Sequence, residues 1–156
     1  MADNLVIILV EDDPFSQKKM CNHLKDLFPD CTIETLANGI QAANYLLSPI
    51  NQYDLVILDG KLKNPNHFVA QFNGPDVANA MQEKGIEVPV VLFTQDPGML
   101  KAFDEVYGKR LPEIEKPCRK ENVSVVLQPV VEAILSSKTR EIEDALEGAS
   151  PPSPGL

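Results

Sequence analysis

The sequence predicts an α/β fold, a doubly wound parallel sheet of five strands with helices on both faces. Two observations lead to this prediction. Segments of strand type alternate along the chain with segments of helix type, which is the pattern of a parallel sheet covered by helices. Three of the strand segments are continuous apolar runs, as strands buried on both faces are, namely Leu5–Val10, Leu55–Leu58 and Val90–Phe93.

In the first part of the chain the expected elements are a strand over 5–10, a helix over 14–28, a strand over 32–36, a helix over 40–47 and a strand over 54–58. Met20 and Leu24 lie on one face of the first helix, and Pro14 suits its first turn, where the missing N–H costs nothing. Thr32–Leu36 alternates apolar and polar residues, as an edge strand does. Ser48-Pro49 stops the second helix.

The remaining elements are a helix over 75–84, a strand over 88–93, a helix over 97–107, a short strand near 113–115 and a last helix. Pro75 begins the first of these helices and Gly85 ends it. The short strand is Ile114 between two glutamates. An apolar stripe from Val123 to Leu135 marks the last helix, and Pro129 inside it predicts a kink or a late start.

The chain is expected to hold one domain, over residues 4–138. A length of 156 residues suits a single domain with a two-sided core. Beyond Lys138 the sequence becomes acidic and then rich in proline and serine. We expect residues 139–156 to form a tail of frayed helix followed by disorder.

The composition of the chain argues against some classes of ligand and indicates the cellular compartment. The net charge of −9 argues against nucleic acid as a direct ligand, because phosphate contacts need clusters of lysine and arginine. No apolar stretch reaches ten residues, far short of a membrane span, and the first residues lack the pattern of a signal peptide. Three cysteines without metal-ligand spacing are typical of reduced thiols. We therefore expect a cytoplasmic protein that binds neither nucleic acid nor membrane.

Polar residues follow four of the strand segments, where each strand ends: Glu11-Asp12-Asp13, Asp59, Thr94 and Lys116-Pro117. In open α/β sheets the carboxyl ends of the strands form the edge at which sites lie. Several carboxylates gathered there repel one another and resist burial unless a cation compensates them. Oxygen ligands in a partly hydrated site favour Mg²⁺, so the sequence predicts a magnesium site.

The same set of residues suits phosphoryl transfer. A metal ion, an ammonium group on Lys116 and a hydroxyl on Thr94 would neutralise the charge of a transferring phosphoryl group. Asp59 would be the nucleophile and would form an acyl phosphate. Simpler roles exist for two of the neighbours, since Asp13 suits the cap of the helix that begins at Pro14, and Thr94 could cap the helix over 97–107.

These residues resemble the receiver domain of two-component response regulators over about residues 4–138. The matching segments are Ile8–Asp13, Val56–Asp59, Val90–Thr94 and Glu115–Pro117, and their order, strand context and spacing all fit. The resemblance implies the flavodoxin-like receiver fold, with strand order 2-1-3-4-5 and five helices. It also implies a Mg²⁺-dependent switch in which Asp59 accepts a phosphoryl group from a histidine kinase or a histidine phosphotransfer protein.

By the same resemblance, Glu11 and Asp12 form the acidic pair at the metal, with Asp12 the direct ligand. The backbone carbonyl of Lys61 would also bind Mg²⁺. Thr94 would hydrogen-bond the phosphoryl group and Lys116 would bind one of its oxygens, next to a cis Lys116–Pro117 bond.

The chain departs from the family pattern in three places. Glu113 stands where an aromatic switch residue is frequent, three residues before Lys116, so the usual coupling between that aromatic residue and the threonine is absent or replaced. Lys63 stands four residues after Asp59, where proline is frequent. The connection over 60–74 is about seven residues longer than usual, and a long loop beside a catalytic edge is often functional.

The sequence thus predicts a stand-alone receiver that signals by protein contacts through the face around residues 97–116. It would catalyse only its own phosphorylation and dephosphorylation, and a homodimer through that face stays open. The first alternative is a pseudo-receiver that acts as a scaffold without phosphorylation. The second is an enzyme or cofactor binder such as a phosphohydrolase or flavodoxin, although Glu11-Asp12-Asp13 would repel the phosphate of a flavin cofactor.

Overall fold

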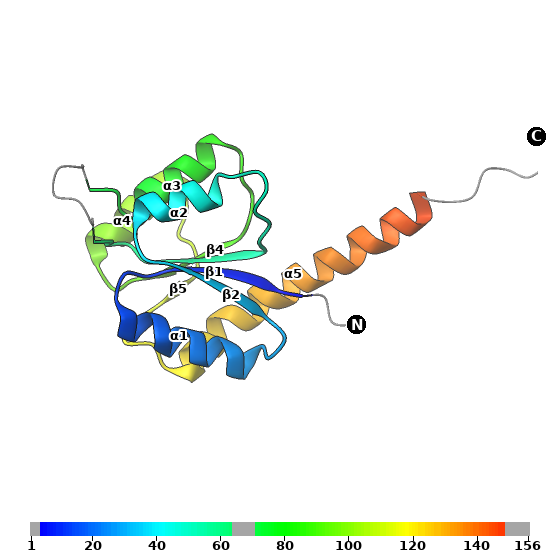
Figure 1. Cartoon of the computed structure of the whole chain (residues 1–156), viewed down its shortest axis with the longest axis horizontal. Coiled ribbons are helices and arrows are strands. Elements are labelled where there is room, and N and C mark those ends of the chain that lie inside the picture. The colour runs from blue at the N-terminus through cyan, green and yellow to red at the C-terminus, as the bar shows by residue number, and fades with distance from the viewer. Residues whose placement is uncertain (1–3, 64–70, 149–156) are drawn as a thin grey trace, which may run out of the picture.

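The computed structural model describes residues 4–63 and 71–148. The sheet and its helices are shown in Figure 1. In chain order the elements are β1 Val6–Val10, α1 Pro14–Leu27, β2 Thr32–Leu36, α2 Gly39–Leu46, β3 Leu55–Leu58, α3 Gly74–Glu83, β4 Val90–Phe93, α4 Pro97–Tyr107, β5 Glu113–Ile114 and α5 Lys120–Gly148. Residues 64–70 of the long connection and 149–156 of the expected tail lie outside the described residues.

The five strands form one parallel sheet in the order β2-β1-β3-β4-β5, which confirms the predicted fold and strand order. The three apolar runs are the central strands, and β2 is an edge strand as its alternating pattern predicts. Val10 pairs with Leu58, and Leu58 pairs with Leu92, so the central strands end nearly level. Their next residues therefore meet at one edge of the sheet.

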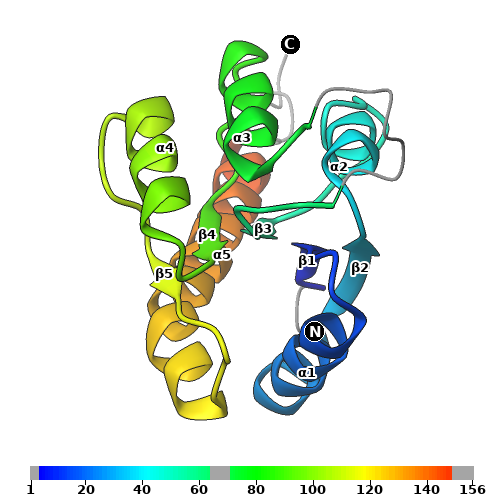
Figure 2. The same ribbon diagram turned by 90° about the vertical axis from the view of Figure 1, so that its left-hand side faces the viewer.

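The core has two layers, one on each face of the sheet. Figure 1 shows α1 and α5 on one face and α2, α3 and α4 on the other, and Figure 2 shows the same division from the side. Within a central strand, alternate residues serve the two layers: Ile7 and Leu9 pack toward α1 and α5, whereas Ile8 and Val10 pack toward α2 and α3. Period-two alternation of side chains explains why these strands must be apolar at every position.

Side-chain caps set the first turns of three helices. The Asp13 carboxylate accepts a hydrogen bond from the backbone N–H of Ser16, so its predicted capping role is confirmed. Asn38 caps α2 in the same way. The cap of α4 is Asp96 and not Thr94, because the Asp96 carboxylate accepts the N–H groups at the start of that helix.

The last helix, α5, does not begin late at Pro129. It begins at Lys120 and runs through Pro129, so the late start is wrong. It also continues as helix past Lys138 to Gly148. Lys138 donates hydrogen bonds to the Asp54 carboxylate at 3.0 Å and to the Asn4 carbonyl at 3.1 Å, which tethers the helix where fraying was expected to begin. The boundary of the domain at residue 138 stays a prediction.

Over residues 4–63 and 71–148, none of the helices combines the length and the hydrophobicity that crossing a bilayer requires.

Candidate functional site

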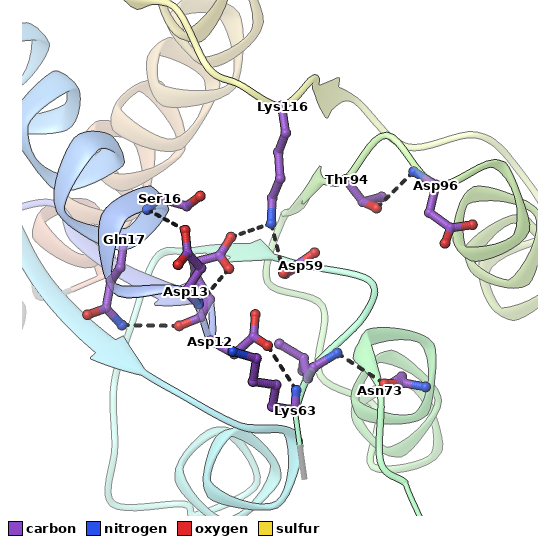
Figure 3. Close-up of polar contacts among 12 residues, drawn as sticks. Asp12, Asp13, Ser16, Gln17, Asp59, Lys63, Asn73, Thr94, Asp96 and Lys116 are labelled. Carbon is purple, nitrogen blue, oxygen red and sulfur yellow. Dashed lines mark hydrogen bonds and ion pairs between the residues drawn. The ribbon is translucent and has the colours of Figure 1, made fainter.

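The predicted site residues meet at the carboxyl edge of the sheet. Figure 3 shows Lys116 reaching from the segment after β5 toward Asp59 at the end of β3, with Asp12 and Asp13 following β1 and Thr94 following β4. Glu11, Asp59 and Thr94 are buried, with exposed fractions of 0%, 4% and 4%. The chain therefore places buried polar groups together at one edge, where each of them requires a partner.

Lys116 is the central cation of the site. Its Nζ lies 2.5 Å from Glu11 Oε2 and 2.8 Å from Asp59 Oδ2. The ammonium group also lies 4.7 Å from the centre of the Phe93 ring, a favourable cation–π distance. The peptide bond after Lys116 is cis, as the resemblance implies. One positive charge thus serves two buried carboxylates.

Glu11 accepts hydrogen bonds from two residues that follow it in the chain. Its Oε1 accepts the Asp13 N–H at 3.0 Å, and its carbonyl accepts a hydrogen bond from the Gln17 side chain at 3.2 Å. Burial raises the pKa of Glu11 to about 8; the hydrogen bond of Lys116 opposes this rise and the charge of Asp59 adds to it. Burial thus favours the protonated form of Glu11 in the metal-free site, against the attraction of Lys116.

The charges of Asp59 and Lys116 depend on each other. Burial raises the pKa of Asp59 above its ordinary value, and the hydrogen bond and charge of Lys116 oppose that rise. Burial also disfavours the charged form of Lys116, but its hydrogen bonds to Asp59 and Glu11 outweigh this, so the pKa of Lys116 is raised. Lys116 is thus kept cationic beside the carboxylate that is proposed to react.

The carboxylates fit a small divalent cation. One oxygen from each of Glu11, Asp12 and Asp59 lies within 4.8 Å of the other two. Opposite ligands of Mg²⁺ stand about 4.2 Å apart, because each bond is ~2.1 Å long. Glu11 Oε2 pairs with Lys116 and Oε1 accepts the Asp13 N–H, which leaves the carboxylate further lone pairs for a bound cation. The donor set is oxygen only, which suits Mg²⁺.

The base of the long connection closes on this site, a feature that sequence reasoning missed. Gly60 accepts a hydrogen bond from the Gly74 N–H at 2.7 Å, and the Leu62 N–H donates to the Asn73 side chain at 3.0 Å. The Lys63 N–H donates to Asp12 Oδ2 at 3.0 Å. In the sequence, the only sign of the contact with Asp12 is that residue 63 is not proline, because proline has no backbone N–H to donate.

Substituting Gly74 by alanine is expected to destabilise the fold by about 2 kcal/mol or more, because its backbone touches β3 too closely for a side chain. A Cβ at Gly74 would lie 2.0 Å from the Asp59 carbonyl oxygen and 2.7 Å from the Phe103 ring. Urea unfolding measures the loss. The matched control is Gly98→Ala, also in the first turn of a helix, where the nearest contact is 3.2 Å to the Asp96 carboxylate. Equal midpoints for the two variants would contradict the close contact.

The remaining predicted residues take distinct places. Thr94 Oγ1 accepts the Asp96 N–H at 3.2 Å, so its hydroxyl links the end of β4 to the cap of α4 and can still donate. Asp13 is used by the α1 cap. Lys61 is exposed in the turn after Gly60, and its carbonyl as a metal ligand stays a prediction. Residue His67 of the connection lies outside the described residues.

Glu113, at the position where an aromatic switch residue was expected, belongs to an ion-pair cluster. Arg110 Nη1 lies 3.6 Å from Glu113 Oε1. The same guanidinium donates two hydrogen bonds to Asp104 of α4, at 2.7 and 2.9 Å. The side chains of Asp104, Arg110 and Glu113 are all partly exposed, so their ion pairs contribute little to the stability of the fold. The cluster connects β5 to α4.

No model of a protein family matches the sequence, and no curated protein matches it. Solved structures do match, over most of the chain. The signal receiver domain of an HD domain-containing protein from Pseudomonas fluorescens Pf-5 matches with 20% identity and a TM-score of 0.69, covering 86% of this chain and 99% of that one. The N-terminal domain of a response regulator/sensory box/GGDEF protein from Carboxydothermus hydrogenoformans matches with 24% identity and a TM-score of 0.62, covering 88% and 98%.

A third match is the receiver domain of a sensor histidine kinase from Pseudomonas aeruginosa PAO1, which has a magnesium ion coordinated in its active site cleft. It shares 21% identity and a TM-score of 0.61, covering 81% of this chain and 97% of that one. The strand order, the five helices and the three similar structures all indicate the same fold. The chain has the fold of the signal receiver domains of response regulators.

Proposed function

We propose that the chain is a phosphorylation-dependent receiver that accepts a phosphoryl group on Asp59. One observation carries the proposal: Asp59 is a buried carboxylate that shares one edge of the sheet with a lysine 2.8 Å away and with two further carboxylates. A purely structural carboxylate would be satisfied by the lysine alone. The acidic neighbours add repulsion, which protonation of Glu11 or a bound cation would relieve.

The reaction is a displacement at phosphorus. An Asp59 carboxylate oxygen attacks the phosphorus of a phosphohistidine on a kinase or phosphotransfer protein, and the new O–P bond forms as the N–P bond breaks. The electron pair of the broken bond stays on the imidazole nitrogen, which takes up a proton. Lys116, whose Nζ lies 2.8 Å from Asp59 Oδ2, would bind a phosphoryl oxygen, and Thr94 would donate its hydroxyl hydrogen to another.

Glu11, Asp12 and Asp59 would hold Mg²⁺, together with the carbonyl of Lys61. The ion would supply charge neutralisation for the phosphoryl oxygens. Two of these carboxylates are already held by backbone hydrogen bonds. Glu11 accepts the Asp13 N–H, and Asp12 accepts the Lys63 N–H. Both contacts hold carboxylate oxygens in place before any cation binds, which lowers the cost of ordering them.

The output is proposed to pass through α4 and β5, the face around residues 97–116, to a protein partner in the cytoplasm. Thr94 supports this route because its hydroxyl is bonded to the Asp96 N–H, at the cap of α4. A shift of Thr94 toward a phosphoryl group would break that bond. Arg110, which contacts Asp104 and Glu113, would then carry the change between α4 and β5 in place of an aromatic switch.

The test is phosphorylation by acetyl phosphate with and without Mg²⁺. We expect the intact protein to gain the mass of one phosphoryl group with Mg²⁺ and none with chelator, and Asp59→Asn to gain none. The control is Asp54→Asn, which changes a carboxylate at the opposite ends of the strands. Absence of labelling in the wild type, or equal labelling of Asp59→Asn, would favour the scaffold alternative.

A further inference from the structure

Two successive backbone N–H groups shortly after Asp59 donate hydrogen bonds in opposite directions. The Leu62 N–H donates to Asn73 Oδ1, just before α3, at 3.0 Å. The Lys63 N–H donates to Asp12 Oδ2, just after β1, at 3.0 Å. Figure 3 shows Asn73 and Asp12 on the two sides of the segment that carries Lys63. The segment therefore has one side turned toward the start of α3 and the other toward the carboxylates of the site.

The bond to Asn73 also sets the direction of the Lys61 carbonyl. That carbonyl and the Leu62 N–H belong to one peptide group, which is trans, since the cis bond of the described residues is Lys116–Pro117. A trans peptide group is planar, and its C=O and N–H point in opposite directions. Because the N–H points to Asn73, the Lys61 carbonyl points to the other side, where Asp12 lies. Within the part of the chain that the structure describes it accepts no hydrogen bond, so its lone pairs are available to a cation.

The rest of this segment is anchored by groups other than the Asn73 side chain. The Leu62 side chain is buried and packs in the layer beside α2 and α3. The Gly60 carbonyl accepts the Gly74 N–H, a bond between two backbone groups. The backbone N–H of Asn73 donates to Asp76 Oδ2 at 2.9 Å. Removing the Asn73 side chain would therefore release the Leu62 N–H and leave these anchors in place.

We propose that Asn73 is a positioning residue for the metal site, because its side-chain oxygen orients the Lys61 carbonyl toward the bound cation. The inference rests on the proposed function, which makes that carbonyl a ligand of Mg²⁺. It adds a residue at the start of α3 to a site whose other residues follow the strands. A carbonyl that is already turned toward the ion has less freedom to lose on binding, so the ion binds more tightly.

Titration calorimetry of the full chain with Mg²⁺ tests this role. Asn73→Ala removes the acceptor oxygen and is expected to bind Mg²⁺ about tenfold more weakly than the wild type, as when a group that orients a metal ligand is lost. Asn73→Asp keeps an acceptor oxygen and is expected to bind at least as tightly as the wild type. The matched control is Asn38→Ala, since Asn38 is likewise the N-cap of a helix, but its side chain bonds Gln41 within α2. This control is expected to bind Mg²⁺ like the wild type.

Amide hydrogen exchange in chelator, followed by NMR, tests the hydrogen bond without any metal. The Leu62 N–H is expected to be protected in the wild type and in Asn73→Asp, and to lose its protection in Asn73→Ala. The Lys63 N–H, which donates to Asp12, is expected to change little in either variant. Rapid exchange of the Leu62 N–H in the wild type overturns the proposal, and that measurement needs no variant.

Two results of the calorimetry also overturn it. One is an Asn73→Ala that binds Mg²⁺ as tightly as Asn38→Ala, and the other is an Asn73→Asp that binds as weakly as Asn73→Ala. Failure of the proposed function gives a different result. A wild type that binds Mg²⁺ but is not labelled on Asp59 refutes the proposed function alone, whereas a labelled wild type whose affinity Asn73→Ala shares refutes the role of Asn73 alone.

Discussion

Replacing Lys116 by methionine is expected to slow the labelling of Asp59 by acetyl phosphate about 10²- to 10³-fold, the usual effect of removing one preorganised charge from a reacting centre. Lys116 Nζ lies 2.8 Å from Asp59 Oδ2 and is the cation that meets the incoming phosphoryl oxygens. Methionine keeps most of the side-chain volume but removes the charge and the Nζ that lies over the Phe93 ring. The initial rate of mass gain with Mg²⁺ present measures the effect.

The matched control is Lys84→Met, which removes an exposed lysine at the far end of α3. It is expected to be labelled at the wild-type rate. A thermal melt of both variants separates a folding defect from a chemical one. The role of Lys116 would be refuted by a folded Lys116→Met that is labelled as fast as Lys84→Met.

Mg²⁺ is expected to bind more tightly as the pH rises toward 8 and to level off above it. The pKa of Glu11 is raised to about 8, so below that pH the metal-free site holds a proton that the ion must displace. Displacement of one proton weakens binding by up to about tenfold for each pH unit below the pKa. Titration calorimetry in buffers of different ionisation enthalpy measures both the affinity and the protons released.

Glu11→Gln is the control for this pH dependence. Glutamine can still accept the Asp13 N–H, as Glu11 Oε1 does at 3.0 Å, but it has no proton to lose. The variant is expected to bind Mg²⁺ with little proton release and a nearly flat pH profile. If Glu11→Gln retained the wild-type profile, the proton would have to come from another group.

The same pKa shift predicts how the metal-free protein responds to pH. The unfolded chain loses the Glu11 proton near pH 4.5, whereas the folded chain keeps it until about pH 8. Between these values the folded state binds more protons, so the free energy of unfolding falls as the pH rises. Thermal melts in chelator should show this fall in the wild type and a smaller one in Glu11→Gln.

Much of the fold could be predicted, because the sequence pattern of each strand and the burial of that strand in the sheet call for the same residues. The apolar runs at Leu5–Val10, Leu55–Leu58 and Val90–Phe93 can be buried on both faces only in a central parallel sheet. The strand ends then had to meet at one edge, so the closeness of Glu11 and Asp59 to Lys116 followed from topology.

Other features could not be predicted, because they depend on contacts between residues far apart in sequence. The Lys63 N–H reaches Asp12 across the site, and Lys138 binds Asp54, separations of 51 and 84 residues. Thr94 suited a cap in sequence, and only the structure shows that Asp96 takes that place at the start of α4. The tail over 139–156 was expected to be frayed helix followed by disorder, and its part up to Gly148 is helix.

The sequence by itself determined which residues form the sheet, which of them end at its carboxyl edge and which chemistry that edge can support. These depend on side-chain type and on periods of two and 3.6 residues, which are local properties. Only the tertiary structure decided how Lys116 is shared between Glu11 and Asp59, how the base of the 60–74 connection closes, and how far α5 extends beyond the sheet. Those depend on burial and on distances in space, which no local pattern contains.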